Sequence, residues 1–229
     1  MRSILSLLLL AHTCVSFDED AILFATLTRD ELQHLDAEGF SAVHRAAGHG
    51  AAEAVIAALE KGVDINHRAT NGMTALAFAA NKGHENIAHV LIERGARLEP
   101  GYPLILAASN GHAAVVRLLL EHGADADATA DALGGTTALH AAATMGQADA
   151  VDALLEGGAD PFFEIELLGT PLQAATSYAH QYSRDENDAL RREVKATNGG
   201  NFKGVLRSLR KAVAAKSKGK SSSRSREEL

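Results

Sequence analysis

The stretch GTTALHAAATMGQADAVDALLEGGAD, from Gly135 to Asp160, predicts two short helices that are each ended by glycine. A helix of small residues is expected to begin near Ala138 and to end before Gly146. A second helix is expected to end at Gly158. Its apolar face is formed by Val151, Leu154 and Leu155.

The same unit recurs three times upstream of this stretch, always in the same phase. Each copy has two glycines twelve residues apart and an apolar anchor seven residues before the first glycine. The anchors are Val43, Leu76, Leu104 and Leu139, and the glycine pairs are Gly50 and Gly62, Gly83 and Gly95, Gly111 and Gly123, and Gly146 and Gly158. Such repetition is typical of a solenoid, in which each unit buries its apolar face against its neighbours.

The residues around the anchors resemble the ankyrin repeat, G-x-T-P-L-H-x-A-A followed by G-H, a leucine-rich helix and G-A-D. The matching segments are GFSAVHRAA from Gly39, GMTALAFAA from Gly72, YPLILAA from Tyr102, GTTALHAAA from Gly135 and TPLQAAT from Thr170. Anchor spacings of 33, 28, 35 and 33 residues agree with a family period of about 33. The resemblance covers residues 36–180, with four full repeats and a divergent fifth. It implies an all-α solenoid of stacked helix pairs with short β-hairpin fingers.

The recurring residues have local reasons to be there. Hydroxyl side chains stand where four of the first helices are expected to begin and can cap their unpaired N–H groups, at Ser41, Thr74, Thr137 and Thr170. Pro103 and Pro171 suit the first helical turn, where no N–H is needed. Pairs of alanines allow the helices to pack closely.

The N-terminal segment, residues 1–16, has the pattern of a secretory signal peptide. Arg2 precedes a short apolar run, and Cys14 and Ser16 are small residues before a cut at Phe17. The alternative is a buried N-terminal helix. Because Cys14 is the only cysteine, the cleaved chain would contain none. Residues 17–35 are expected to form a capping half-repeat.

The C-terminal part is predicted to close the array and then to end in a tail. Residues 181–215 are expected to form closing helices, with Val205, Leu206, Leu209 and Val213 at helical spacing. Residues 216–229, KSKGKSSSRSREEL, are expected to be disordered. The last four, Arg226, Glu227, Glu228 and Leu229, resemble K-D-E-L retention signals that a receptor binds. Together with the signal peptide they predict the lumen of the endoplasmic reticulum; the alternatives are secretion, or the cytosol if the N-terminus is not cleaved.

Charge is distributed unevenly along the chain. Residues 203–229 hold nine Lys or Arg and two Glu, which gives a net charge of +7. Because the whole chain has a net charge of −7, residues 1–202 carry −14. A basic tail on an acidic body is compatible with contacts to nucleic acid or anionic lipid. The interpretation favoured here is a solvated tether, because no aromatic residue is interleaved for base stacking.

The resemblance implies a non-catalytic, monomeric scaffold that binds a protein or peptide partner on the concave surface of fingers and inner helices. Unusual finger lengths and aromatic residues on loops suggest the contact points. The predicted partner-binding residues are Arg68, Tyr102, Leu133, Phe162, Phe163 and Tyr178. Phe162 and Phe163 have an alternative role, which is to fill the core of the last repeat. The rival function is a cytosolic or nuclear adaptor whose basic tail contacts nucleic acid or lipid.

No catalytic residue, cofactor or membrane span is expected. His44 and His140 occupy the T-P-L-H position, where the ring is expected to form hydrogen bonds between turns. An enzyme with a site at Tyr178 to Arg184 is a third hypothesis, but no nucleophile–base pair supports it. Asp125 and the acidic residues after it resemble the start of a calcium loop. Ala130 and Thr136 stand where the loop needs glycine and glutamate, so no metal site is predicted.

Overall fold

The computed structural model describes Thr28, Leu32 and residues 40–98, 101–130, 134–166, 168–184 and 201–227; the side chains of residues 180–184 and 218–227 are not described. The predicted signal peptide, residues 1–16, lies outside the described residues. Of the predicted capping segment, residues 17–35, only Thr28 and Leu32 are described, and Leu32 is fully buried.

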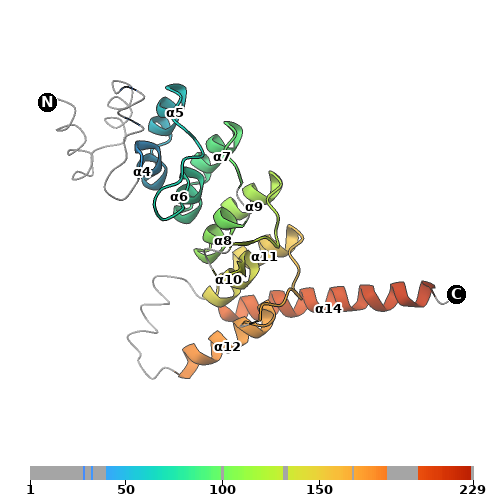
Figure 1. Cartoon of the computed structure of the whole chain (residues 1–229). Helices are drawn as coiled ribbons and strands as arrows, with labels where there is room; N and C mark the ends of the chain where they lie inside the picture. The colour runs from blue at the N-terminus through green and yellow to red at the C-terminus, as the bar shows by residue number, and fades with distance from the viewer. Residues whose placement is uncertain are drawn as a thin grey trace. The chain divides into compact units, whose positions relative to one another are not determined.

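Contacts between Cα atoms divide the chain into two compact units. Unit 1 comprises Met1–Ala79 and His84–Arg97, and unit 2 comprises Ala80–Gly83 and Leu98–Leu229. The division passes through the helix α6 (Ala75–Lys82), whose last turn belongs to unit 2. The described residues form ten helices and a single two-stranded sheet (Figure 1), which confirms the predicted all-α class.

Unit 1 contains two short helices in each repeat. Helix α4 (Ala42–His49) packs against α5 (Ala52–Glu60), and α5 packs against α7 (Glu85–Glu93). The side chains between the helices are small or branched, and the anchors Val43 and Leu76 are almost completely buried. Such small side chains let the helix axes come close together, which gives dense packing.

Unit 2 contains α8 (Tyr102–Ser109), α9 (Ala113–Glu121), α10 (Ala138–Met145), α11 (Ala148–Glu156), α12 (Pro171–Arg184) and α14 (Phe202–Glu227). The first helices α8, α10 and α12 pack in succession, and α9 packs against α11. The anchors Leu104 and Leu139 are buried, as are the alanines around them. This order of contacts is the one that stacked helix pairs require.

The repeated glycines have the backbone conformation predicted for helix ends. All eight glycines of the repeated pairs have φ between 72° and 97°. Helix α10 begins and ends where the sequence predicted. Helix α11 ends at Glu156, slightly earlier than predicted, and its Leu155 is half-buried, whereas Val151 and Leu154 are fully buried.

Hydroxyl caps start several of the first helices, whereas α8 begins after Gly101. Thr74 Oγ1 accepts the Ala77 N–H at 3.3 Å. Thr170 and Gln173 form a reciprocal pair, in which Gln173 N–H donates to Thr170 Oγ1 at 3.3 Å and Thr170 N–H donates to Gln173 Oε1 at 2.8 Å. These contacts satisfy N–H groups that the first turn leaves without a partner.

The fingers are short, as predicted. The strands β1 (Thr129–Ala130) and β2 (Thr136–Thr137) pair antiparallel, with Thr129 opposite Thr137. Residues 131–133 between them lie outside the described residues. In the finger after α11, Ile165 and Gly169 form an isolated antiparallel bridge.

Two C-terminal elements are longer than the sequence suggested. Helix α12 continues through Arg184, because Ala179 stands where the other repeats have a helix-ending glycine. The tail predicted to be disordered from Lys216 is instead helical through Glu227, as part of α14. Lys216 lies 3.0 Å from Asp160 of the preceding finger, and Ser217 Oγ donates to the Val213 carbonyl at 2.8 Å. These contacts support the helix past the predicted boundary.

Helix α14 closes unit 2. It packs against α11 and α12 through Val205 and Leu209, which are both fully buried. Asn201 fixes the start of the helix: its backbone N–H donates to the Gly146 carbonyl at 2.7 Å, and its side chain accepts the Gly204 N–H at 2.9 Å. A Cβ at Gly204 would lie 2.9 Å from the Ala148 Cβ, so the approach to α11 depends on this glycine.

Candidate functional site

The histidines in the T-P-L-H position hold neighbouring turns together. Ser41 N–H donates to His44 Nδ1 at 3.2 Å, and His44 Nε2 lies 3.0 Å from the His67 carbonyl. An N–H group only donates and a carbonyl only accepts, so Nε2 carries the proton and Nδ1 accepts. The ring is therefore neutral and has a structural role.

His140 has the same role in unit 2. Its Nε2 donates to the Gly169 carbonyl at 2.9 Å, and Thr137 Oγ1 lies 2.8 Å from its Nδ1. Burial of the ring holds the pKa of His140 below its ordinary value of 6.5, and the hydrogen bond to Gly169 opposes that shift. A buried neutral imidazole whose two nitrogens both have partners is not available as a catalytic base.

The residue after three of the helix-ending glycines makes a side-chain hydrogen bond to the previous repeat. In unit 1, His84 Nε2 lies 3.2 Å from the Gly48 carbonyl. In unit 2, His112 Nε2 lies 3.2 Å from the Asn81 carbonyl, and Gln147 Nε2 donates to the Ser109 carbonyl at 3.2 Å. These side chains fix the spacing of the first helices, and with it the surface that the helices present.

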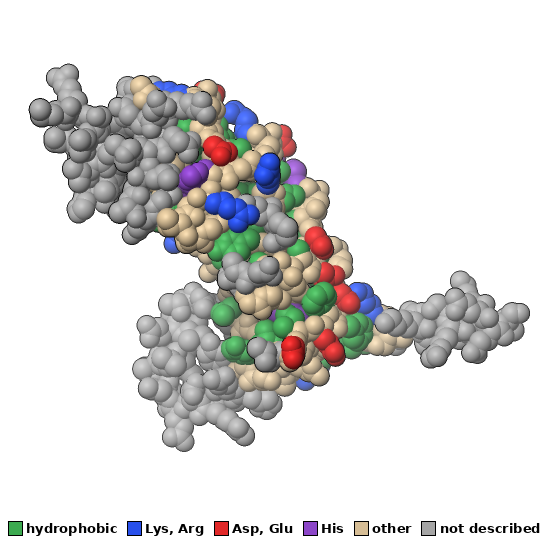
Figure 2. Space-filling model, in the orientation of Figure 1, with side chains coloured by type: hydrophobic (Ala, Val, Ile, Leu, Met, Phe, Trp, Pro, Cys, Tyr) green, Lys and Arg blue, Asp and Glu red, His purple; other side chains and the backbone are tan. Residues whose placement is uncertain are grey.

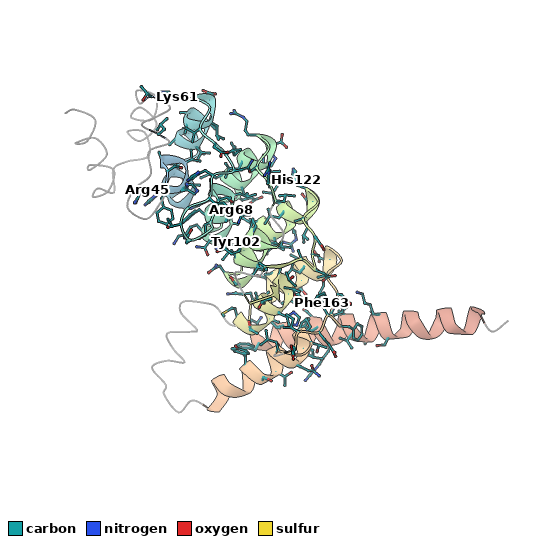
Figure 3. The ribbon with its side chains drawn as sticks, viewed as in Figure 1. Arg45, Lys61, Arg68, Tyr102, His122 and Phe163 are labelled. Carbon is teal, nitrogen blue, oxygen red and sulfur yellow. The ribbon has the colours of Figure 1, made fainter. Side chains whose placement is uncertain are left out.

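The structure places the predicted partner-binding residues on several elements (Figure 3). Arg68 is exposed and belongs to unit 1. In unit 2, Tyr102 starts α8, Tyr178 lies on α12, and both are half-buried. Leu133 lies outside the described residues. Arg68 belongs to unit 1, whereas the other described candidates all belong to unit 2.

Phe162 and Phe163 are both half-buried in the finger after α11. The Phe163 ring lies edge-on to the His140 ring, with centroids 6.4 Å apart. Each ring therefore has a packed side and a solvent-facing side. This placement suits a surface contact, and it also gives Phe163 part of the packing role that was the alternative.

A row of residues that the sequence did not single out crosses unit 2. The first three members are exposed and lie six residues after an anchor, at the end of a first helix or directly after it; the fourth lies six residues after Leu172, in the middle of α12. We call Lys82, Asn110, Met145 and Tyr178 the helix-end row. Met145 is the one exposed large hydrophobic residue in the described part of the chain, with 39% of its surface accessible.

Hydrogen bonds order one part of this row. Asn110 Nδ2 donates to Asn81 Oδ1 at 3.1 Å and to the Leu106 carbonyl at 2.9 Å. Only Tyr178 of the row was predicted. The signal for the other three was their constant distance from the anchor, but residues beside a helix-ending glycine are usually taken as turn residues.

The described residues contain no group of three or more His, Cys, Asp or Glu side chains placed to hold a metal ion. None of the helices in the described part of the chain is long and apolar enough to cross a bilayer. Acidic side chains gather over the part of unit 2 where α11 and α14 lie, with basic side chains beside them (Figure 2).

Comparison with a curated protein gives a partial match. The Arabidopsis thaliana protein "Acyl-CoA-binding domain-containing protein 2" is 34% identical over 73 residues, which are 32% of this chain and 20% of that protein. The chain thus spans about a fifth of the length of that relative. What the name says about a ligand belongs to that protein.

The family described as ankyrin repeats (3 copies) matches residues 10–102 and 97–164, which together exceed half of the chain. This family is typically non-catalytic. The match agrees with the glycine-ended helix pairs, the hydroxyl caps and the hydrogen-bonded histidines. The chain therefore belongs to the ankyrin repeat family.

Proposed function

We propose that this chain is a scaffold that binds a protein or peptide partner through unit 2, in the lumen of the endoplasmic reticulum. Ankyrin repeats indicate a protein–protein interaction scaffold. The partner would contact the helix-end row and the exposed sides of Tyr102, Phe162 and Phe163.

The helix-end row carries this proposal. It places an exposed methionine and a half-buried tyrosine on the successive first helices α10 and α12, after an asparagine at the end of α8 whose amide is already oriented. Methionine and tyrosine are common contact residues in interfaces because they offer a large apolar area together with adaptable or polar groups.

The rigidity of the supporting helices favours binding. The alanines beneath the row, including Ala107, Ala108, Ala142 and Ala143, are fully buried. Closely packed helices have little freedom to lose when a partner docks, so the entropic cost of association falls mainly on the partner. A surface fixed in this way selects partners by shape.

The location rests on the two ends of the chain. Residues 1–16 have the pattern of a signal peptide, and Arg226, Glu227, Glu228 and Leu229 resemble a retention signal. A receptor of the K-D-E-L type would then be a second, separate partner.

Site-specific photo-crosslinking tests the proposed surface. A photoreactive residue is introduced in place of Met145, and a matched one replaces Asp152, which is exposed on the second helix α11. We expect a discrete covalent adduct from position 145 in intact cells and none of the same mass from position 152. The proposal fails if both positions give the same adducts, or if position 145 gives none.

A further inference from the structure

Helix α14 has two faces of opposite character. Val205 and Leu209 are buried against α11 and α12. On the other side of the helix, at about 100° of rotation per residue, lies a basic face that we define as Lys203, Arg207, Arg210 and Lys211. All four are exposed.

The four cations have no direct acidic partner among the described residues. Within the described part of the chain, none of them forms an ion pair or a side-chain hydrogen bond. Lys216, in contrast, is also exposed but pairs with Asp160 at 3.0 Å. No acidic residue occurs between Phe202 and Arg226, so the helix itself offers no partner to the basic face.

Folding does not require this arrangement. Lys203 and Arg207, and Arg207 and Lys211, are like charges four residues apart, which destabilise a helix by about 0.2–0.5 kcal/mol per pair. The helix is held by its apolar face, so neutral residues on the basic face would fold at least as well. A feature that opposes local stability is expected where it serves binding.

We propose that the basic face of α14 binds an acidic segment of a protein partner. The carboxylates of that segment would lie about 6 Å apart along one side, because residues four apart on a helix have this spacing. The basic face extends for about 12 Å from Lys203 to Lys211. A short acidic helix or peptide matches this length. The basic face is separate from the helix-end row, so an experiment can contradict one of the two proposed surfaces without contradicting the other.

The charge of the whole chain favours a short acidic segment over an extended polyanion. Residues outside 203–229 carry −14, which repels long polyanions such as nucleic acid or an anionic bilayer that reach beyond the helix. The basic face has no aromatic residue on which a base could stack. Val205 and Leu209 of α14 are buried in the protein and are not available to enter a membrane.

The test measures binding between the purified full chain and a labelled peptide by fluorescence anisotropy. The peptide has twelve residues, with glutamate at every fourth position and alanine elsewhere. R207Q/R210Q removes two charges from the basic face. The matched control R94Q/R97Q removes two exposed arginines of unit 1. We expect R207Q/R210Q to weaken binding about fivefold or more, since each ion pair contributes up to about 1 kcal/mol. The control variant should bind as the unaltered chain does.

Three further measurements decide between occupants. Oligo-dT and vesicles containing phosphatidylserine should bind more weakly than the peptide, and R207Q/R210Q should not change their binding more than R94Q/R97Q does. Sedimentation of the chain alone should show a monomer. The proposal is overturned if oligo-dT or vesicles bind more tightly than the peptide and R207Q/R210Q abolishes that binding, or if the chain self-associates and this variant abolishes the association. It is also overturned if both variants lose peptide binding equally, or if the peptide does not bind.

Discussion

Gly83 shows how a missing side chain sets the distance between two repeats of unit 2. Its φ is 76°, and a Cβ there would lie 2.7 Å from Cε1 of His112, whose ring also bonds to the Asn81 carbonyl. The glycine is therefore needed both for its backbone conformation and for the space it leaves.

Substitution of two glycines separates these two requirements. Gly123 also has a positive φ, 90°, but a Cβ there meets nothing within 4 Å. Gly123→Ala should lower the free energy of unfolding by about 1–2 kcal/mol through backbone strain alone. Gly83→Ala should lower it by at least about 1 kcal/mol more, because the imidazole must move. Urea unfolding measures both; equal losses would show that the His112 contact is unimportant.

His140 should make stability depend on pH. Its pKa in the folded chain lies below the ordinary 6.5, so between the two values the unfolded chain binds a proton that the folded chain does not. The neutral ring's contribution is complete above about pH 6.5 and is lost as the pH falls toward the folded-state pKa. The slope reaches at most about 1.4 kcal/mol per pH unit for one proton.

Comparison with His140→Gln isolates this effect from the other histidines. Glutamine does not titrate, and its amide retains a donor for the Gly169 carbonyl. Urea unfolding between about pH 5 and 8 should show the stability advantage of the unaltered chain shrinking below pH 6.5. A constant difference across that range would contradict the assignment.

Much of the residue-scale structure was accessible from the sequence. The buried anchors, the hydroxyl caps and the positive φ of the repeated glycines follow from local chemistry, which acts the same way in every repeat. The helix-end row was not accessible, apart from Tyr178. The constant distance of its members from the anchors indicates the positions, but whether Asn110 or Met145 is exposed depends on how neighbouring helices pack.

At the scale of elements, the C-terminal helices differ most from expectation. A glycine ends each earlier first helix, but Ala179 lets α12 run on to Arg184. Helix α14 passes the predicted end of order because its anchoring contacts come from distant residues, including Asn201 with Gly146 and Lys216 with Asp160. Composition alone could not reveal these tertiary contacts.

The stability of unit 2 should depend on the docking of α14. Leu209 is fully buried on the face that meets α11 and α12, whereas Lys211 is exposed on the basic face. Leu209→Ala should lower the free energy of unfolding by about 2–5 kcal/mol. The matched variant Lys211→Ala should change it by no more than about 0.5 kcal/mol. If Leu209→Ala were as mild as the control, α14 would not be an integral part of unit 2.

At the scale of the whole molecule, the chain combines an acidic body with a basic C-terminal segment. The proposed partner surfaces follow this division. The helix-end row carries a single charge, at Lys82, whereas α14 presents four cations together. One scaffold could therefore hold two partners of different chemistry, one selected by shape and the other by charge.

The proposed location makes a prediction about both ends of the chain. If residues 1–16 direct entry into the secretory pathway, the protein recovered from microsomes should begin at Phe17. If Arg226–Leu229 is bound by a retention receptor, deletion of these four residues should release the protein into the medium. Deletion of Ser222–Ser225 removes the same number of residues and keeps the final four, so it should leave retention unchanged.

The two ends give independent readouts, which makes the outcomes separable. An intact Met1 would contradict entry into the lumen and favour the cytosolic alternative. A start at Phe17 with unchanged retention after deletion of Arg226–Leu229 would keep the lumen but remove the receptor. Helix α14 continues through Glu227, so the signal would begin inside a helix. A receptor that binds an extended C-terminus must unwind that last turn, which should cost little because helix ends fray readily.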